Sequence, residues 1–395
     1  MASRPYDVLN STEAREEAAG NPDSFLHVVK PEIDLPIDTD LYSRDVYQKG
    51  LKNFRRLLDA GIFVEDSGPC FYLYELTMDG CSQTGIVGCS AVEDYFNDII
   101  LKHELTRPEK EEDRKNHIRH TDMNAEPVFF TYRANDKLDE LVARKTEVEP
   151  VYDFTAVDGI RHRFWVVSDE SWIEQVVQVF HSIPYVYVAD GHHRTAAAAL
   201  VGRERQADNP DHCGEEEYNF FLSVLFPDNQ LRILDYNRVI RDLNGHSVSD
   251  LLERLDENFE VAPMGSDPWR PDRAHVLSMY LKGTWYQLVA REGTFDDTDP
   301  IRSLDVNVLS DCVLEPIFKI TDLRKDKRID FVGGMRGLAE LSRRVDSGEM
   351  AVAFALYPVS MDQLLTISDT GNIMPPKTTW FEPKLRSGLV VHRIV

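Results

Sequence analysis

A five-residue loop, Asp190-Gly191-His192-His193-Arg194, combines titratable side chains with a glycine and a guanidinium. It follows residues 184–189, an apolar run that predicts a strand, and precedes residues 195–200, an alanine-rich stretch that predicts a helix. The first N–H groups of a helix have no acceptor within the helix, so they point outward as donors. A strand, a glycine turn and a helix start in this order predict an anion site, such as one for phosphate.

The residue types of the loop fit a bound phosphate. Gly191 allows a sharp turn and a close approach of backbone to ligand. His192, His193 and Arg194 stand at the positive end of the helix dipole, where a cation loses roughly 0.3–1 kcal/mol. A phosphate beside Arg194 would reverse that loss, because a guanidinium binds it with two parallel hydrogen bonds. Gly191, His192, His193, Arg194 and Thr195 are therefore the predicted phosphate-binding or nucleotide-binding residues.

Two other interpretations of the loop stay open. Arg194 can pair with a carboxylate elsewhere while both histidines are core residues bonded to backbone. Alternatively, Asp190, His192 and His193 can ligate a metal ion. Adjacent histidines rarely aim at one ion, however, and no helical His-x-x-x-His pair accompanies them. The strand-to-helix context favours phosphate over both alternatives, and we predict no metal site.

A second cluster is Lys102-His103-Glu104-Leu105-Thr106-Arg107. It precedes a densely charged helix that we expect to start at Thr106, with Thr106 as its cap. A carboxylate beside a histidine, ahead of a helix start, can act as a general base near bound phosphate. Glu104 and His103 are thus catalytic candidates, although this pattern by itself fits a solvated surface acid at Glu104 better.

The rest of the sequence predicts the elements that position these residues. Helices are expected near residues 11–19, 45–60, 106–113 and 248–259, and strands near 70–76, 127–132, 275–281, 284–290 and 350–356. Lys282-Gly283 joins two of these strands and is typical of a hairpin. The mixture predicts an α+β fold with two domains, residues 1–245 around both clusters and residues 246–395 as a C-terminal α+β domain with a packed tail.

Composition limits the class of partner. The chain has 395 residues and a formal net charge of -24. A surface this acidic repels DNA, RNA and anionic membranes, so we expect small-molecule partners only. Five scattered cysteines argue against a disulfide framework, and no apolar signal core or membrane-length run occurs. A cytoplasmic address is the simplest expectation, and the oligomeric state is not indicated.

Basic residues in the tail are a further observation. Lys377, Lys384 and Arg386 lie among Trp380, Phe381 and several prolines. These cations could fold back over a carboxylate-bearing substrate. The alternative is a packed C-terminal strap with solvated lysines. Together with Arg107 from the second cluster, Lys377 and Lys384 are the possible substrate-binding residues.

Five segments carry a resemblance to a known family. They are Pro5–Val8, Lys102–Arg107, Tyr187–Ala196, Asp235–Arg238 and Met374–Leu385. On these segments, the chain resembles the ten-fifteen family of domains of unknown function from end to end.

Residues from about 102 to 200 also resemble the ParB/sulfiredoxin superfamily, most closely its nucleotide-dependent free serine kinases. The shared order is His103-Glu104, then Pro127-Val128, then Asp190–Arg194. The resemblance implies a ParB/sulfiredoxin-like mixed core and a kinase that uses ATP or ADP with Mg2+ to convert L-serine to O-phosphoserine. It implies that Glu104 is the base and Gly191–Thr195 the phosphate cradle, and that Asp190 assists the nucleotide-bound magnesium.

Other activities of that superfamily fit less well. Sulfiredoxin chemistry needs a cysteine where this chain has His192. ParB-type proteins follow the loop with a helix-turn-helix, which is not evident after Leu200. The main alternative is a non-catalytic nucleotide-binding regulator, which would keep the Asp190–Arg194 loop but would not need Glu104.

Overall fold

The computed structural model describes residues 1–395, and the chain divides into two compact units. Unit 1 comprises Met1–Lys102, Thr106–Leu231 and Pro383–Val395, and unit 2 comprises His103–Leu105 and Arg232–Glu382. The sequence predicted a division at residue 245 with the tail in the second domain. The structure instead changes units after Leu231 and returns the last residues to unit 1.

Unit 1 is built on a mixed eight-stranded sheet with the order β3-β8-β5-β9-β2-β1-β7-β6. Its strands are β1 Phe71–Met78, β2 Cys81–Ala91, β3 Ile100–Leu101, β5 Val128–Tyr132, β6 Tyr152–Thr155, β7 Arg161–Val167, β8 Val186–Asp190 and β9 Phe220–Pro227. Strand β8 runs parallel to β3 and antiparallel to β5, and β5 runs parallel to β9. A separate short pair joins β4 (Met123–Asn124) to β18 (His392–Arg393) near the C-terminus.

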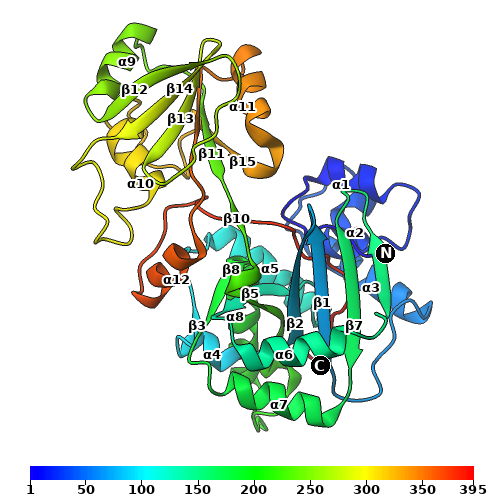
Figure 1. The fold of residues 1–395 in the computed structure, drawn as a ribbon. Coiled ribbons are helices and arrows are strands. Elements are labelled where there is room, and N and C mark those ends of the chain that lie inside the picture. The colour runs from blue at the N-terminus through cyan, green and yellow to red at the C-terminus, as the bar shows by residue number, and fades with distance from the viewer. The chain divides into compact units, whose positions relative to one another are not determined.

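Eight helices surround this sheet. They are α1 Ser11–Ala18, α2 Leu26–Val29, α3 Arg44–Asp59, α4 Val92–Phe96, α5 Pro108–Thr121, α6 Asp136–Thr146, α7 Glu170–Phe180 and α8 His192–Asp208. Helices α6 and α7 lie side by side against β1 and β7 (Figure 1), where Leu73, Trp165 and Trp172 share one apolar cluster. Helix α8 packs against α5 and β5, and its Ala196–Ala199 run is buried. Because these alanine side chains are small, α8 packs close to the sheet. The first turn of α8 is therefore shielded from solvent.

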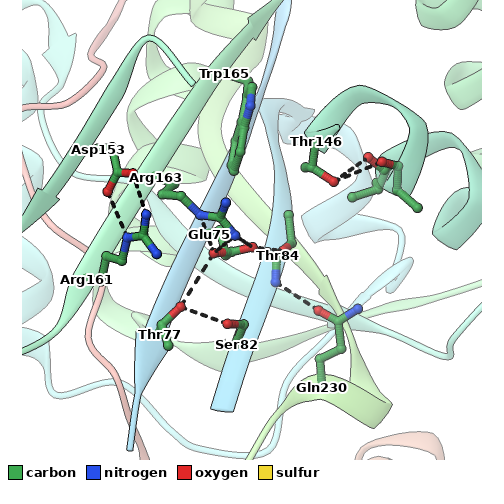
Figure 2. A network of polar contacts seen from close by, with 12 residues as sticks. Glu75, Thr77, Ser82, Thr84, Thr146, Asp153, Arg161, Arg163, Trp165 and Gln230 are labelled. Atoms are coloured by element: carbon green, nitrogen blue, oxygen red, sulfur yellow. Dashed lines mark hydrogen bonds and ion pairs between the residues drawn. The ribbon is translucent and has the colours of Figure 1, made fainter. Parts of the chain in front are cut away.

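A polar network continues the face of the sheet that carries Leu73 and Trp165 (Figure 2). Glu75 of β1 and Arg163 of β7 stand opposite each other in register and form two hydrogen bonds of 2.7 Å. Arg161 bonds to Asp153 of the neighbouring strand at 2.8 Å. Pairs of opposite charge on adjacent strands stabilise a sheet and fix its register. These carboxylates are satisfied by their neighbours, so we assign the network a structural role.

Unit 2 has a six-stranded antiparallel sheet with the order β12-β14-β13-β16-β11-β15. Its strands are β11 Tyr236–Ile240, β12 Phe259–Gly265, β13 Val276–Leu281, β14 Thr284–Ala290, β15 Ile329–Gly333 and β16 Val352–Ala355, and β10 Ile233–Leu234 pairs separately with β17 Trp380–Phe381. Its helices are α9 Val248–Asp256, α10 Asp305–Leu309, α11 Gly337–Asp346 and α12 Met361–Asp369. Helix α11 packs on the sheet, with Leu341 in one cluster with Trp285.

The mixed architecture confirms the predicted α+β class. The predicted hairpin is also confirmed, since Lys282 and Gly283 have φ values of 49° and 83° between β13 and β14. The predicted cap at Thr106 is wrong. Helix α5 begins at Pro108 after Arg107, and the Thr106 hydroxyl donates to Glu111 at 2.7 Å instead. None of the helices is long and apolar enough to span a membrane.

A histidine between two carboxylates fastens a loop in unit 2. The His275 ring stacks on Phe295 with centroids 3.8 Å apart, and its Nε2 is 2.9 Å from Asp297 Oδ1. The backbone N–H of His275 donates to Asp305 at 2.8 Å. Asp305 and, to a smaller extent, Asp297 raise the pKa of His275 above its ordinary value, although burial of the ring acts to lower it.

This arrangement predicts a pH-dependent contribution to stability. Because the pKa of His275 is higher in the folded state than in the unfolded state, protonated His275 stabilises the fold. This stabilisation is fully present at a pH below the unfolded-state pKa of about 6.5, and it is lost as the pH rises through the folded-state pKa. His275→Asn removes the titration but tolerates the positive φ of 63°. We expect the unfolding temperature of the wild type, measured by calorimetry, to fall by roughly 2 °C more than that of this variant between pH 5.5 and 8.5. Equal losses in both proteins would contradict the assignment.

Candidate functional site

The predicted strand, glycine turn and helix are present in unit 1. Strand β8 ends at Asp190, Gly191 is the N-cap residue with φ +95°, and α8 begins at His192. Asp190 pairs with Phe129 of β5 where the register of that strand shifts, so a bulge lies beside the loop. Gly191 has no side chain to cap the helix, and a helix start without a cap can offer its N–H groups to an anion.

Arg194 points into the protein. Its side chain folds back over Gly191, so that a Cβ on Gly191 would lie 3.2 Å from the guanidinium. One nitrogen, Nη1, donates to the Pro127 carbonyl at 2.5 Å, and Nη2 lies 3.9 Å from Asp190. The residue is 7% exposed, and its buried Nε has no hydrogen-bond partner. Arg194 thus stands behind the loop instead of projecting into solvent.

Carboxylates balance the buried charge of Arg194. Burial acts to lower the pKa of Arg194, but the charges of Asp7, Glu126 and Asp190 outweigh it and raise that pKa. From the sequence alone, Arg194 could pair with either a carboxylate or a phosphate. The structure supplies carboxylates, so a phosphate is not needed to explain the burial of this cation.

Lys384 from the C-terminal tail completes the loop. Its Nζ is 3.0 Å from Asp190 Oδ2. Burial acts to raise the pKa of Asp190, but Lys384 and then Arg194 outweigh it and hold that pKa well below its ordinary value. The carboxylate is therefore ionised at neutral pH. Residues predicted separately in the loop and in the tail are brought together here.

The second cluster contacts the loop through Arg107. The backbone N–H of Arg107 donates to His193 Nε2 at 3.0 Å. Because Nε2 accepts this bond, it carries no proton, and a neutral His193 has its proton on Nδ1. His193 therefore serves here as a hydrogen-bond acceptor that fastens the chain before α5, while the Arg107 side chain is exposed.

Thr195 is turned toward the loop itself. It is completely buried, and its hydroxyl donates to the Gly191 carbonyl at 3.0 Å. This bond stabilises the turn, and a phosphate contact by this hydroxyl remains a prediction. His192 is 8% exposed in the first turn of α8. No group of three His, Cys, Asp or Glu side chains is arranged to hold a metal ion.

Glu126 is a polar hub that sequence reasoning missed. It accepts hydrogen bonds from the Tyr6 backbone N–H at 3.0 Å and from the Ser387 hydroxyl at 2.9 Å. Arg114 of α5 lies over the Tyr6 ring at 4.0 Å and 3.9 Å from Glu126. Burial raises the pKa of Glu126, although Arg194 and Arg114 act to lower it.

A small cavity of about 30 Å³ opens beside this hub, lined by Arg114, Glu126 and Arg194 among others. That volume suits roughly one water molecule. In the sequence, only the Pro5–Val8 motif pointed to this region. Glu126 and Ser387 do not belong to any motif or periodic pattern that would have marked them.

The tail is anchored to the sheet by a second buried chain of contacts. Arg386 donates through its backbone to Tyr74 at 3.2 Å and through Nε to His162 at 3.2 Å, and it also pairs with Asp158. The Tyr74 hydroxyl is 2.8 Å from His162 Nδ1. Burial, helped by Arg386, lowers the pKa of His162 to about 4. Arg386 is thus a structural anchor that delivers Lys384 to the loop.

Other predicted residues belong to unit 2. His103 is buried, its carbonyl accepts from Met374 at 2.8 Å, and its Nε2 lies 3.5 Å from Thr379. Glu104 is half-buried in the same short segment. Lys377 has its Nζ over the Tyr236 ring at 5.6 Å, so the two tail lysines occupy different units.

The comparisons with known proteins identify the family. Residues 1–307 match the model described as "Protein of unknown function (DUF1015)", so the chain belongs to this family and the predicted resemblance is confirmed. No curated protein matches the sequence.

Similar solved structures include a free serine kinase in complex with AMP, at 12% identity and a TM-score of 0.36 over 75% of this chain and 86% of that chain. A conserved hypothetical protein from Pyrococcus furiosus has 13% identity and a TM-score of 0.35, covering 75% and 90%. SbnI with a C-terminal truncation from Staphylococcus aureus has 12% identity and a TM-score of 0.38, covering 76% and 85%. TM-scores this low carry no argument about the function of this chain.

The contact between Gly191 and Arg194 generates a testable prediction. Gly191→Ala adds a Cβ both to a left-handed backbone and against the guanidinium. Gly214→Ala is the matched control, because Gly214 has the same φ of +95° with nothing within 4 Å. We expect the control to lose about 1–2 kcal/mol of unfolding free energy and Gly191→Ala to lose more, measured by urea denaturation. Equal losses would mean that Arg194 does not need its position over Gly191.

Proposed function

We propose that this protein is a small-molecule kinase that transfers the terminal phosphoryl group of ATP or ADP, with Mg2+, to a hydroxyl acceptor, most simply free L-serine. The observation that carries the proposal is the Asp190–Lys384 pair at the start of α8. Phosphoryl transfer needs positioning and neutralisation of charge more than covalent chemistry. A lysine held at 3.0 Å by an ionised aspartate, beside a helix start without a side-chain cap, supplies both requirements.

Each residue then has a defined task. The Gly191–Thr195 turn receives the phosphates, and Lys384 moves from Asp190 to the phosphoryl oxygens. Asp190, already ionised, would then be free to help hold the magnesium of a bound nucleotide, which would neutralise phosphate charge. Arg194 holds the loop from behind through the Pro127 carbonyl and Asp190, while His193 fixes the chain at Arg107.

Glu104 is the proposed base, three residues before Arg107 along the chain. The acceptor oxygen attacks the terminal phosphorus, the bond from phosphorus to the bridging oxygen breaks, and the acceptor proton passes to Glu104. The products are a phosphate ester and the nucleotide shortened by one phosphate.

A nucleotide-binding regulator is the second candidate. The observation in its favour is that carboxylates already balance Arg194, which leaves Lys384 as the main cation for a transferred phosphoryl group. Such a protein would bind nucleotide at the same loop without needing Glu104.

Replacement of Glu104 separates the two candidates. We expect Glu104→Gln to lower phosphoserine production by roughly 10²–10⁴-fold, because the base is lost, without weakening nucleotide binding. Phosphorus NMR would follow the product and calorimetry the nucleotide. Glu109→Gln, an exposed position in α5, is the control. Nucleotide binding without product from any protein would favour the regulator, and unchanged turnover in Glu104→Gln would exclude Glu104 as the base.

The two tail lysines should behave differently. We expect Lys384→Ala to weaken nucleotide binding by about tenfold or more, because a charge-assisted contact to phosphate is lost, and Lys384→Arg to restore much of it. Lys377→Ala should leave the nucleotide affinity within about twofold. Calorimetric titration measures both, and thermal unfolding shows whether Asp190 without its partner disturbs the fold. Unchanged affinity in a folded Lys384→Ala protein would remove Lys384 from the site.

A further inference from the structure

The N-terminal part of unit 1 has a hollow that the proposed kinase site does not use. Helices α1 and α2 pack with the short 3₁₀-helix Pro31–Asp34 (Figure 1), and an open pocket of about 460 Å³ lies among them. This volume is in the range of pockets that hold small ligands. Two ionisable side chains and several small or apolar residues line the pocket, among them Arg15, His27, Ala18, Ala19, Pro22 and Ile33.

Backbone carbonyls fix the guanidinium of Arg15 at this pocket. Its Nε donates to the Ile33 carbonyl at 3.1 Å. Its Nη2 donates to the carbonyls of Glu32 and Leu35 at 2.8 and 2.9 Å. These carbonyls lie at the C-terminal end of the 3₁₀-helix, where a cation is favoured. The remaining nitrogen, Nη1, makes no hydrogen bond, so a guanidinium that is already oriented keeps two N–H groups for a ligand.

The charge of Arg15 has no carboxylate partner in the fold. Glu32 lies beside the carbonyls that hold Arg15, but its own carboxylate pairs with Lys30 at 3.0 Å. Glu16 follows Arg15 in α1, and successive residues of a helix point in different directions, so Glu16 is not part of the pocket wall. The wall therefore carries a positive charge that the protein does not balance.

His27 shapes another part of the wall. Its Nδ1 is 2.8 Å from Asp34 Oδ1, and its Nε2 is 3.2 Å from the Asn21 carbonyl. The contact with Asn21 holds the turn after α1, which lines the pocket. Lys49 lies 3.6 Å from Asp34, so this carboxylate is balanced without Arg15. The complement of the pocket is thus an anion.

We propose that this pocket binds a small carboxylate that carries a short aliphatic chain. The carboxylate accepts charge-assisted hydrogen bonds from Nη1 of Arg15, which are stronger than bonds between neutral groups. The chain lies against the apolar wall of Ala18, Pro22 and Ile33, where its surface is removed from water. Because Arg15 is fixed in advance, binding loses little side-chain entropy. The site does not depend on the kinase proposal, since no residue of the wall belongs to Asp190–Thr195.

Probes that share one chain length test the proposal on the full-length protein. Sodium butyrate carries the anion, n-butanol is neutral and n-butylamine is a cation, while inorganic phosphate is an anion without a chain. Binding would be followed by NMR through the backbone amides of Gly20 and Asn21, both in the pocket wall. The amide of Gly191 would report separately on the phosphate loop.

Wild type would be compared with three variants. Arg15→Gln removes the charge, and circular dichroism shows whether it folds without the carbonyl bonds. Ala19→Trp fills the hollow with an indole and leaves Arg15 in place, so it tests the site even if Arg15→Gln is unfolded. Ala143 is exposed in α6 and does not line the pocket, so Ala143→Trp is the control for the added ring.

We expect butyrate to shift the Gly20 and Asn21 amides in a saturable way. Butanol, butylamine and phosphate should bind at least about tenfold more weakly, because each lacks either the negative charge or the chain. Folded Arg15→Gln should lose about tenfold in butyrate affinity. Ala19→Trp should abolish the binding, and Ala143→Trp should leave it unchanged.

Several results would overturn the inference. They are the absence of butyrate binding, equal binding of butyrate and butanol, or phosphate binding at Gly20 as tight as that of butyrate. Unchanged butyrate affinity in Ala19→Trp would have the same meaning. Shifts confined to Gly191 would place the anion at the phosphate loop and would also reject the pocket.

Discussion

A buried guanidinium requires hydrogen-bond acceptors and negative charge close by, and Arg194 imposes this requirement on unit 1. Three segments distant in sequence meet it. The β4–β5 connection gives Glu126 and the Pro127 carbonyl, the N-terminal turn gives Asp7, and β8 ends in Asp190. The left-handed Gly191 is needed because a side chain there would meet the guanidinium at 3.2 Å. Much of the polar architecture of unit 1 follows from accommodating this one cation.

The same requirement bears on the phosphate site that we propose at this loop, where Arg194 is internally balanced. If Arg194 projected into solvent, its charge would be screened and its side chain disordered before binding. Fixed behind the loop, it keeps Asp190 ionised together with Lys384. The fixed Asp190 carboxylate can in turn hold the largely buried Lys384 ammonium at 3.0 Å. Lys384 is the cation that we propose meets the phosphate, and the buried charges hold it in place.

Local patterns allowed the core of the site to be predicted. The Tyr-Val-Tyr-Val run before Asp190-Gly191 predicts a strand, and the alanines after Arg194 predict a helix. Both elements are present. The Lys282-Gly283 hairpin was predictable for the same reason. The hub could not be predicted, since Tyr6 and Ser387 meet Glu126 across separations of 120 and 261 residues. The Pro5–Val8 motif marked Tyr6 as a family residue but did not indicate its partner. The direction of Arg194 was likewise undetermined, because it depends on a carbonyl 67 residues away.

The path of the chain has a consequence for how the site forms. Unit 1 is interrupted after Leu231 and resumed at Pro383, so Lys384, Arg386 and Ser387 join it last. Arg386 is buried against Tyr74 and His162, and Ser387 exchanges backbone hydrogen bonds with Ser3 near the start of the chain. Contacts between residues so far apart in sequence have an entropic cost of loop closure. This cost grows only slowly with loop length, and several buried polar hydrogen bonds offset it. The lysine that we assign to the phosphate reaches Asp190 from a tail segment that also pairs with the N-terminal segment, through Ser387 and Ser3. A truncation of the tail should therefore remove a part of the site itself, and the integrity of unit 1 and its capacity to bind an anion should be lost together.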